Sequence, residues 1–341
     1  MKPEVSERLF MEELFKNSKE RLGRSDINLN KIERLTGDAS TRRYYRLFTN
    51  EQTFVACLDN PSELERNSFV NIQHFLEENK VRVPKIFDMN LFKGYMLQED
   101  LGNQTLLQKL SEINSLDEEY EIYKRIIDVL LKIHGVEEKS TKDSSLFNES
   151  FDFKKLNYEI EFTVGYYFKK FLNITDENIM KNVVDEFKPV CERLAKEKMV
   201  LTHRDFHSRN IMVKDDEYIV IDFQDARMGI PQYDLVSVLE DCYYAIDPRN
   251  KEKLIQYYYE NLDEKIHGQK SFSNFMKLYD DMLLQRVFKA IGSFSYIHET
   301  RKDVRYIKYI GFAMEKIRTC MTGKEEYSSL RKLLLETYYA S

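Results

Sequence analysis

Two aspartates and an asparagine stand at fixed intervals in the segment VLTHRDFHSRNIMVKDDEYIVIDFQD, residues 200–225. Asp205 and Asn210 lie between two apolar runs, and Asp222 ends a third one. Carboxylate and amide oxygens are hard ligands that suit Mg²⁺ held partly by nucleotide phosphates, so we assign Asn210 and Asp222 to the metal. Asp205 would orient an acceptor hydroxyl and take its proton, which makes phosphoryl transfer the favoured chemistry.

Each of these residues alone has a simpler explanation. Asp205 fits a turn cap, Asn210 a left-handed loop residue, and Asp222 the end of a strand. The joint pattern HxDxxxxN, followed twelve residues later by an aspartate with apolar neighbours, is far more specific. We therefore interpret the three residues as one site.

Short strands are needed to bring these side chains together. Apolar residues predict three of them, at 200–202, 211–213 and 218–223, which would share one polar face with the three side chains at their ends. Upstream, the first ~30 residues favour a charged amphipathic helix. A helix over 64–78 is expected among four further strands, at 41–49, 53–58, 81–90 and 94–100.

Beyond residue 105 the helical period of 3.6 residues dominates the pattern of apolar side chains. The change falls at LQEDLGNQTL, where a strand gives way to an acidic turn that contains glycine. The sequence therefore predicts an α+β fold with two lobes. Residues 1–100 would form a small β-rich lobe, and residues 101–341 a larger helical one.

Composition excludes several classes of partner. Lys and Arg number 52 against 58 Asp and Glu, and the net charge of −6 gives no basic field for nucleic acid. The four cysteines are far apart and fit reduced thiols. No segment predicts a signal peptide or a membrane span, so we expect a cytoplasmic protein that does not bind membranes. The pattern does not indicate an oligomeric state.

The stretches HRDFHSRN and IDFQD resemble the catalytic loop and metal-binding segment of the aminoglycoside phosphotransferase-like branch of the protein-kinase fold. A protein kinase is disfavoured, because the twelve residues from Asp222 to Asp234 leave no room for an activation segment. The resemblance implies that Asp234 is a buried brace of the catalytic loop and that His203 supports it. His134 is expected to be a core histidine.

Several further motifs resemble the bacterial N-acetylmuramate/N-acetylglucosamine anomeric kinase family of cell-wall recycling. They cover nearly the whole chain: GDASTRRYYR, EDLGNQTL, HRDFHSRN, DFQDARMG, YDLVSVLEDCY and LLQRVFKAIGSF. The resemblance implies that ATP phosphorylates the C1 hydroxyl of a free amino sugar and gives a sugar 1-phosphate. Two alternatives stay open: a kinase of another small alcohol, such as an aminoglycoside or choline, and a nucleotide-binding pseudokinase that regulates a partner.

The segment LTGDASTRRYYRL lies where a phosphate-covering hairpin is expected. Small residues there let backbone N–H groups approach phosphate oxygens, so we assign Gly37, Ser40 and Thr41 to the nucleotide. Gln98 and Asp100, at the turn between the lobes, are assigned to it as well.

One position departs from the general kinase pattern, because FVACLD puts Leu58 where VAIK would supply a phosphate-binding lysine. Arg43 or Arg46 could replace that charge, and alternation along a strand puts them on opposite faces. We favour Arg43, although a surface ion pair explains it nearly as well. The same departure is the argument for the pseudokinase.

Acceptor recognition is expected from polar residues set among apolar ones in the helical lobe. Gln224 and Asp225 follow the metal ligand and could bond sugar hydroxyls, and Asp225 could equally support the metal site. Asp241 is a further candidate. Arg286 could bind a carboxylate such as the lactyl acid of muramate, or form an ion pair between helices.

Overall fold

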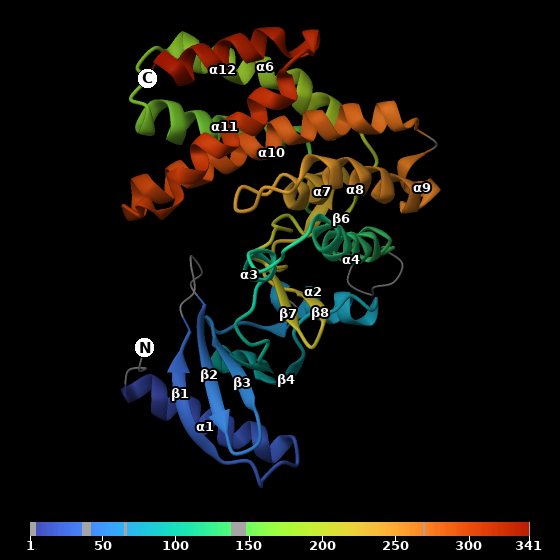
Figure 1. Cartoon of the computed structure of the whole chain (residues 1–341). Coiled ribbons are helices and arrows are strands. Elements are labelled where there is room, and N and C mark those ends of the chain that lie inside the picture. The colour runs from blue at the N-terminus through green and yellow to red at the C-terminus, as the bar shows by residue number, and fades with distance from the viewer. Residues whose placement is uncertain (1–4, 36–41, 65–66, 138–147, 269, 341) are drawn as a thin grey trace. The chain divides into compact units, whose positions relative to one another are not determined.

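The computed structural model describes residues 5–35, 42–64, 67–137, 148–268 and 270–340 (Figure 1). The chain forms two compact units: unit 1 contains residues 1–104 and 212–224, and unit 2 contains residues 105–211 and 225–341. We expected the helical lobe to contain every residue from 101 onward, whereas residues 212–224 belong to unit 1. Backbone hydrogen bonds explain this, since Val213 N–H donates to the Gln104 carbonyl and Val220 N–H to the Arg82 carbonyl.

Unit 1 contains a five-stranded antiparallel sheet with the strand order β1-β2-β3-β5-β4. Its strands are β1 (Leu29–Arg34), β2 (Arg43–Thr49), β3 (Thr53–Leu58), β4 (Ile86–Asn90) and β5 (Tyr95–Glu99). The other elements are the helices α1 (Val5–Arg21) and α2 (Ser68–Glu78), the 3₁₀ turn η2 (Leu91–Lys93), and the hairpin strands β7 (Ile211–Lys214) and β8 (Glu217–Val220). The strand predicted at 53–58 is confirmed, and the one predicted at 41–49 is β2, which begins at Arg43, while residue 41 lies outside the described residues. The one expected at 81–90 begins only at Ile86, because Pro84 has no N–H for a ladder.

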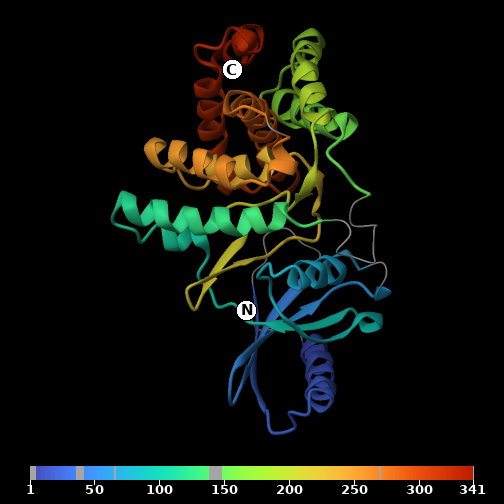
Figure 2. The same ribbon diagram turned by 90° about the vertical axis from the view of Figure 1, so that its right-hand side faces the viewer.

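Helix α1 runs along one face of this sheet in both views (Figure 1, Figure 2). Apolar residues of the helix and of that face form one buried core: Met11, Leu14, Phe15, Ile27, Ile32, Tyr45, Leu47, Phe54, Ala56, Leu58, Tyr95 and Leu97. Because side chains alternate along a strand, Arg43 shares this face with Tyr45, whereas Arg46 and Gln98 lie on the opposite face. The expectation that Arg43 and Arg46 face opposite ways is confirmed.

Unit 2 is mainly helical. Its helices are α3 (Leu106–Leu110), α4 (Leu116–His134), α5 (Phe153–Thr163), the π-helix η5 (Val164–Phe171), α6 (Glu177–Ala195), α7 (Gln232–Leu239), α8 (Pro248–Asn261), α9 (Glu264–His267), α10 (Phe272–Arg301), η6 (Val304–Tyr306), α11 (Lys308–Met321), η7 (Glu325–Tyr327) and α12 (Ser328–Ala340). Helix α10 packs against α5, α6, α7 and α11, so it forms the centre of this unit (Figure 1).

Two short ladders replace the single three-stranded face that we expected around the catalytic loop. β6 (Val200–Thr202) pairs with β9 (Arg227–Gly229), and β7 pairs with β8. The strand β9 was missed because its three residues, Arg-Met-Gly, carry no alternating apolar pattern. Strand β8 ends at Val220, so Asp222 lies in the turn beyond it.

Helices α5 and α10 approach each other closely at Gly292. A Cβ at this position would overlap the side chain of Thr163 and lie 2.7 Å from its Cα. The Thr163 hydroxyl donates to the carbonyls of Glu159 and Phe288, which ties the two helices together there. Glycine at 292 therefore sets the spacing that positions the side chains of α10.

Within the described residues, no helix combines the length and the apolar character that crossing a bilayer requires.

Candidate active site

The loop that carries Asp205 is fixed by a buried carboxylate. Asp234, on α7, is fully buried and accepts hydrogen bonds from the N–H groups of His203 (2.6 Å) and Arg204 (3.0 Å). His134 lies 3.3 Å from the same carboxylate and 2.5 Å from the Tyr258 hydroxyl. Arg204 adopts a φ of 79°, a conformation that costs a non-glycine residue energy, which these bonds to Asp234 offset. The scaffold roles predicted for Asp234 and His134 are confirmed.

A second buried carboxylate fixes the other end of the loop. Asp241 Oδ2 accepts hydrogen bonds from the N–H (2.9 Å) and the hydroxyl (2.5 Å) of Ser208. Its Oδ1 accepts from the Tyr243 N–H at 2.9 Å. Since both oxygens hold backbone in place, the geometry favours a bracing role for Asp241, and its assignment to the acceptor stays a prediction.

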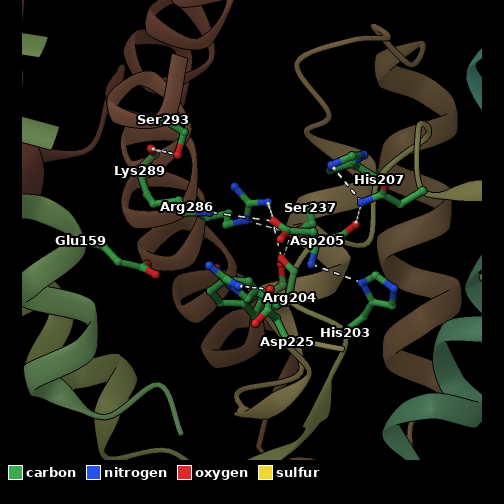
Figure 3. A network of polar contacts seen from close by, with 12 residues as sticks. Glu159, His203, Arg204, Asp205, His207, Asp225, Ser237, Arg286, Lys289 and Ser293 are labelled. Carbon is green, nitrogen blue, oxygen red and sulfur yellow. Dashed lines mark hydrogen bonds and ion pairs between the residues drawn. The ribbon is translucent and has the colours of Figure 1, made fainter. Parts of the chain in front are cut away.

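Three cations gather around Asp205 (Figure 3). The Asp205 carboxylate lies 3.3 Å from Arg286 Nη2 and 3.8 Å from Lys289 Nζ, both on α10. Arg286 is fixed in turn, because its Nε donates to the Ser237 hydroxyl at 3.0 Å. The third cation is Arg204, whose charge also lowers the pKa of Asp205. We call these four residues, Arg204, Asp205, Arg286 and Lys289, the Asp205 cluster.

Burial and the charges of this cluster shift the pKa values of Asp205 and Lys289. Burial alone would raise the pKa of Asp205, but the nearby charges of Lys289 and Arg286 outweigh burial and lower it well below its ordinary value. Burial lowers the pKa of Lys289 to about 8, although the Asp205 carboxylate works against that change. At neutral pH Asp205 is therefore ionised, and Lys289 carries most of its charge.

Positive charge exceeds negative charge at Asp205. Arg204 has a carboxylate partner of its own, Asp225, at 2.9 Å. Nearby Glu159 lies 3.8 Å from Lys155 and accepts from the Gln285 amide, so it is matched elsewhere. Arg286 and Lys289 remain opposite the single carboxylate of Asp205, whose side chain is 27% exposed. Arg286 forms an ion pair, but its partner is the candidate base in a loop and not a residue of another helix as in the alternative that we held open. Its role as a carboxylate-binding group stays a prediction.

The side chain of Asn210 is bound to the backbone of the loop that carries Asp205. Its side-chain amide nitrogen donates to the Asp205 carbonyl at 3.0 Å, which fixes the plane of the carboxamide. Its amide oxygen is a hard donor of the kind that Mg²⁺ prefers. Asn210 thus fits Mg²⁺ by donor type, and its assignment to the metal stays a prediction.

Asp222 lies in unit 1, in the turn that follows β8. Its φ of 64° is unusual for a residue with a side chain, and such strain is concentrated at functional sites. The Gln224 amide donates to Asp222 Oδ1 at 2.8 Å. Gln224 therefore supports the carboxylate, while its predicted contact with the acceptor stays a prediction. So does the convergence of Asp222 with Asp205 and Asn210.

The face of the sheet opposite α1 carries the residues that suit a nucleotide. Gln98 is 4% exposed there, and its amide nitrogen has no hydrogen-bond partner among the described residues. A buried donor without a partner is costly, and an acceptor atom of a bound base would satisfy it. Asp100 is bound by Arg46 at 2.7 Å and by the Gly102 N–H, so its carboxylate stabilises the turn that follows β5.

The other predicted nucleotide residues have different outcomes. Arg43 lies on the face covered by α1 and pairs there with Glu7 at 2.5 Å. This position matches the ion pair that we held open for Arg43 and gives no support for a phosphate contact. The remaining three, Gly37, Ser40 and Thr41, lie outside the described residues.

A family model described as the phosphotransferase enzyme family matches residues 31–265. The chain belongs to the phosphotransferase enzyme family. Like this family, it transfers a phosphoryl group to a hydroxyl acceptor. A curated relative from Pseudomonas aeruginosa, named N-acetylmuramate/N-acetylglucosamine kinase, is 27% identical over 88% of this chain and 86% of its own length. One of the same name from Pseudomonas putida is 29% identical with the same coverage.

Solved structures show the fold of this phosphotransferase. The ADP-bound aminoglycoside phosphotransferase APH(2'')-Ib has a TM-score of 0.57 at 18% identity, over 88% of this chain and 97% of that one. The choline kinase LicA from Streptococcus pneumoniae has a TM-score of 0.59 at 13% identity, over 91% and 99%. The predicted family and the kinase-like α+β fold are both confirmed.

Sequence reasoning missed two cations of this phosphotransferase. Lys289 follows Arg286 by three residues, a spacing that puts both on one helix face, so the segment QRVFKA carried a usable signal. Arg42 precedes Arg43 and lies on the face that Arg43 avoids. Only the position of α1 shows that Arg43 lies on the covered face of the sheet and Arg42 on the opposite face.

Proposed function

We propose that this phosphotransferase is an ATP-dependent kinase of N-acetylmuramate and N-acetylglucosamine that phosphorylates the anomeric C1 hydroxyl and releases a sugar 1-phosphate and ADP. Two curated relatives are named N-acetylmuramate/N-acetylglucosamine kinase, which supports the two sugars as acceptors. The observation that carries the choice of acceptor is the excess of positive charge at Asp205.

Asp205 is the base in this proposal. Its lowered pKa keeps it ionised, so it accepts a hydrogen bond from the C1 hydroxyl and orients the oxygen toward the γ-phosphorus of ATP. The hydroxyl proton passes to the Asp205 carboxylate as the C1 oxygen bonds to phosphorus and the bond to ADP breaks. A base with so low a pKa is weak, which suits a loose transition state that needs orientation more than early deprotonation.

Asn210 and Asp222 would hold Mg²⁺, which supplies charge neutralisation on the nucleotide phosphates. Asn210 is suited to this by its amide oxygen, a hard donor, and Asp222 by its carboxylate, which the Gln224 amide supports. Gln98 would donate its unpaired amide hydrogen to the adenine base. Use of ATP is in keeping with a cytoplasmic enzyme that returns cell-wall sugars to synthesis.

The charge of the Asp205 cluster separates this proposal from its rivals. Aminoglycosides and choline are cations, and two positive side chains facing one carboxylate would repel them. The lactyl carboxylate of muramate is attracted by the same charges, and Lys289 and Arg286 are the groups suited to bind it. N-acetylglucosamine lacks the carboxylate and would gain nothing from them.

A comparison of acceptors tests the proposal. The specificity constant kcat/KM is measured with ATP and Mg²⁺ for N-acetylmuramate, N-acetylglucosamine, kanamycin and choline. We expect turnover of both sugars and none of the two cations. Preference for kanamycin or choline would make the protein a kinase of cationic alcohols, and ATP binding without turnover of any acceptor would favour the pseudokinase.

A further inference from the structure

An arginine and an aspartate form an ion pair at the start of β2, on the face of the sheet that α1 leaves uncovered. Arg42 directly precedes the strand, and alternation puts its side chain on the same face as Tyr44 and Arg46. Arg42 Nε donates to Asp59 Oδ2 at 2.8 Å, and the two side chains are only 13% and 18% exposed. The pair is therefore well ordered and largely shielded from water.

The backbone around Asp59 is fixed by a close approach. The Asp59 N–H donates to the Gly94 carbonyl at 2.8 Å, and Gly94 has a φ of 64°. A Cβ at position 94 would overlap the Asp59 carbonyl oxygen, so only glycine permits this contact. The Asn60 N–H donates to Asp59 Oδ1 at 2.8 Å and leaves Oδ2 for Arg42. Asp59 is consequently a rigid support that sets the direction of the guanidinium.

Two stacked aromatic rings connect Arg42 to the predicted metal ligand within unit 1. The guanidinium carbon of Arg42 lies 5.0 Å from the centre of the Phe69 ring. Phe69 stacks on Phe223 with centroids 4.9 Å apart and planes inclined by 28°. Phe223 directly follows Asp222 in the chain. Contacts through Phe69 and Phe223 thus connect the guanidinium of Arg42 to the segment that carries Asp222.

The phosphate-binding lysine of protein kinases is replaced at its position on β3. In protein kinases a lysine on the third strand pairs with a glutamate on the following helix and contacts phosphates. Here Leu58 takes the lysine position and is buried against α1, and α2 has no acidic residue in its first turn. Arg42 and Asp59 supply the same two charges from other positions of the sheet.

We propose that Arg42 binds the nucleotide phosphates in place of the strand lysine and that Asp59 is its positioning residue. This rests on the proposed function for ATP as the phosphoryl donor. A guanidinium has five N–H donors, so Arg42 can bond several groups at once, and Asp59 and Tyr44 are two of its partners. Its planar fork matches two oxygens of a phosphate, which a lysine does not.

The test compares binding of ATP·Mg²⁺ with binding of adenosine, which has no phosphates, by calorimetry on the full chain. Arg42→Met is expected to weaken ATP binding about tenfold to a hundredfold, the effect of one charge-assisted contact, and to leave adenosine binding unchanged. Arg21→Met removes another arginine of unit 1, whose partner is Asp88, and is expected to change neither affinity. Equal losses for ATP and adenosine, or no loss of ATP binding, would overturn the proposal.

A double variant separates binding from folding. Arg42→Met alone leaves Asp59 unpaired, whereas Arg42→Met with Asp59→Asn leaves no isolated charge and is expected to fold. If the pair were only structural, the double variant would recover ATP binding. Our assignment predicts that it stays as weak as Arg42→Met, and recovery would contradict it.

These binding measurements need no acceptor, so they distinguish the two proposals. Selective loss of ATP binding in a protein that phosphorylates no sugar would reject the proposed acceptor and keep Arg42. Turnover of N-acetylmuramate with unchanged ATP affinity in Arg42→Met would keep the acceptor and reject Arg42.

Discussion

Charge is balanced differently in the two units of this protein. In unit 1, three neighbouring arginines each have a carboxylate partner: Arg42 has Asp59, Arg43 has Glu7, and Arg46 has Asp100. In unit 2, Arg286 and Lys289 share the one carboxylate of Asp205. One-to-one pairing orients side chains with little net charge, whereas shared pairing leaves positive charge that can act on an anionic acceptor.

The carboxylates of the two units also differ in their exposure to solvent. The Asp100 side chain is 5% exposed, and its oxygens are held by Arg46 and by the Gly102 N–H. The Asp205 side chain is 27% exposed and remains open to a further hydrogen bond. Two similar ion pairs thus differ: Asp100 stabilises a turn, whereas the partly exposed Asp205 suits the proposed role of proton acceptor.

The largest expected effect is that of Asp205→Asn in unit 2, which is compared with an Asp→Asn substitution in unit 1. Asp205→Asn removes the proton acceptor, so we expect kcat to fall by about 10²- to 10⁴-fold while ATP affinity is unchanged. Asp88→Asn, which weakens the ion pair with the exposed Arg21 in unit 1, is the control and should leave kcat unchanged. Steady-state kinetics and calorimetry measure the two quantities, and an active Asp205→Asn enzyme would refute the assignment of the base.

A smaller effect is expected where helix spacing positions the cluster. Gly292→Ala puts a methyl group against Thr163 and pushes α10, which carries Arg286 and Lys289, away from α5. Such overpacking costs about 1–3 kcal/mol, so we expect a lower Tm and a lower kcat.

The matched control is Gly165→Ala, at a helical glycine whose added Cβ meets no atom within 4 Å. Thermal unfolding of both variants should show a loss for position 292 alone. Equal Tm values for the two would contradict the packing argument.

The smallest expected effect is a pH dependence of KM, which tests the excess positive charge at Asp205. Burial lowers the pKa of Lys289 to about 8, so its positive charge is present below that pH and is lost above it. KM for N-acetylmuramate should therefore rise on the order of tenfold from pH 7 to pH 9, whereas KM for uncharged N-acetylglucosamine should not change. Lys289→Met should remove this difference between the sugars, and its persistence in that variant would assign the pH effect to another group.

The sequence predicted the loop that carries Asp205 and one of its two buried carboxylate braces. The spacing of Asp205, Asn210 and Asp222 predicts the chemistry, because three separate constraints on residue type rarely coincide, and the roles of the three residues stay predictions. The family resemblance placed Asp234 correctly as a buried brace, and the apolar helical stripe around His134 placed that histidine correctly in the core, whereas Asp241 was assigned to the acceptor.

Contacts between elements were beyond the sequence. The sequence left a choice between Arg43 and Arg46, which requires knowing which face of the sheet α1 covers, because alternation alone gives two equal answers. The three short strands were assigned to one face because each pattern is local, while the pairing of β6 with β9 joins segments far apart in the chain. Lys289 was missed because its partner, Asp205, is brought to it only by the fold.

The product of the reaction tests the central claim most directly. The enzyme is incubated with ATP, Mg²⁺ and N-acetylmuramate, and the product is examined by ³¹P and ¹H NMR beside a matched sugar whose C1 oxygen is blocked by a methyl group. We predict a phosphorus signal coupled to the anomeric proton, and no phosphorylation of the blocked sugar. Phosphorus coupled to a proton on any other carbon, or phosphorylation of the blocked sugar, would contradict the account.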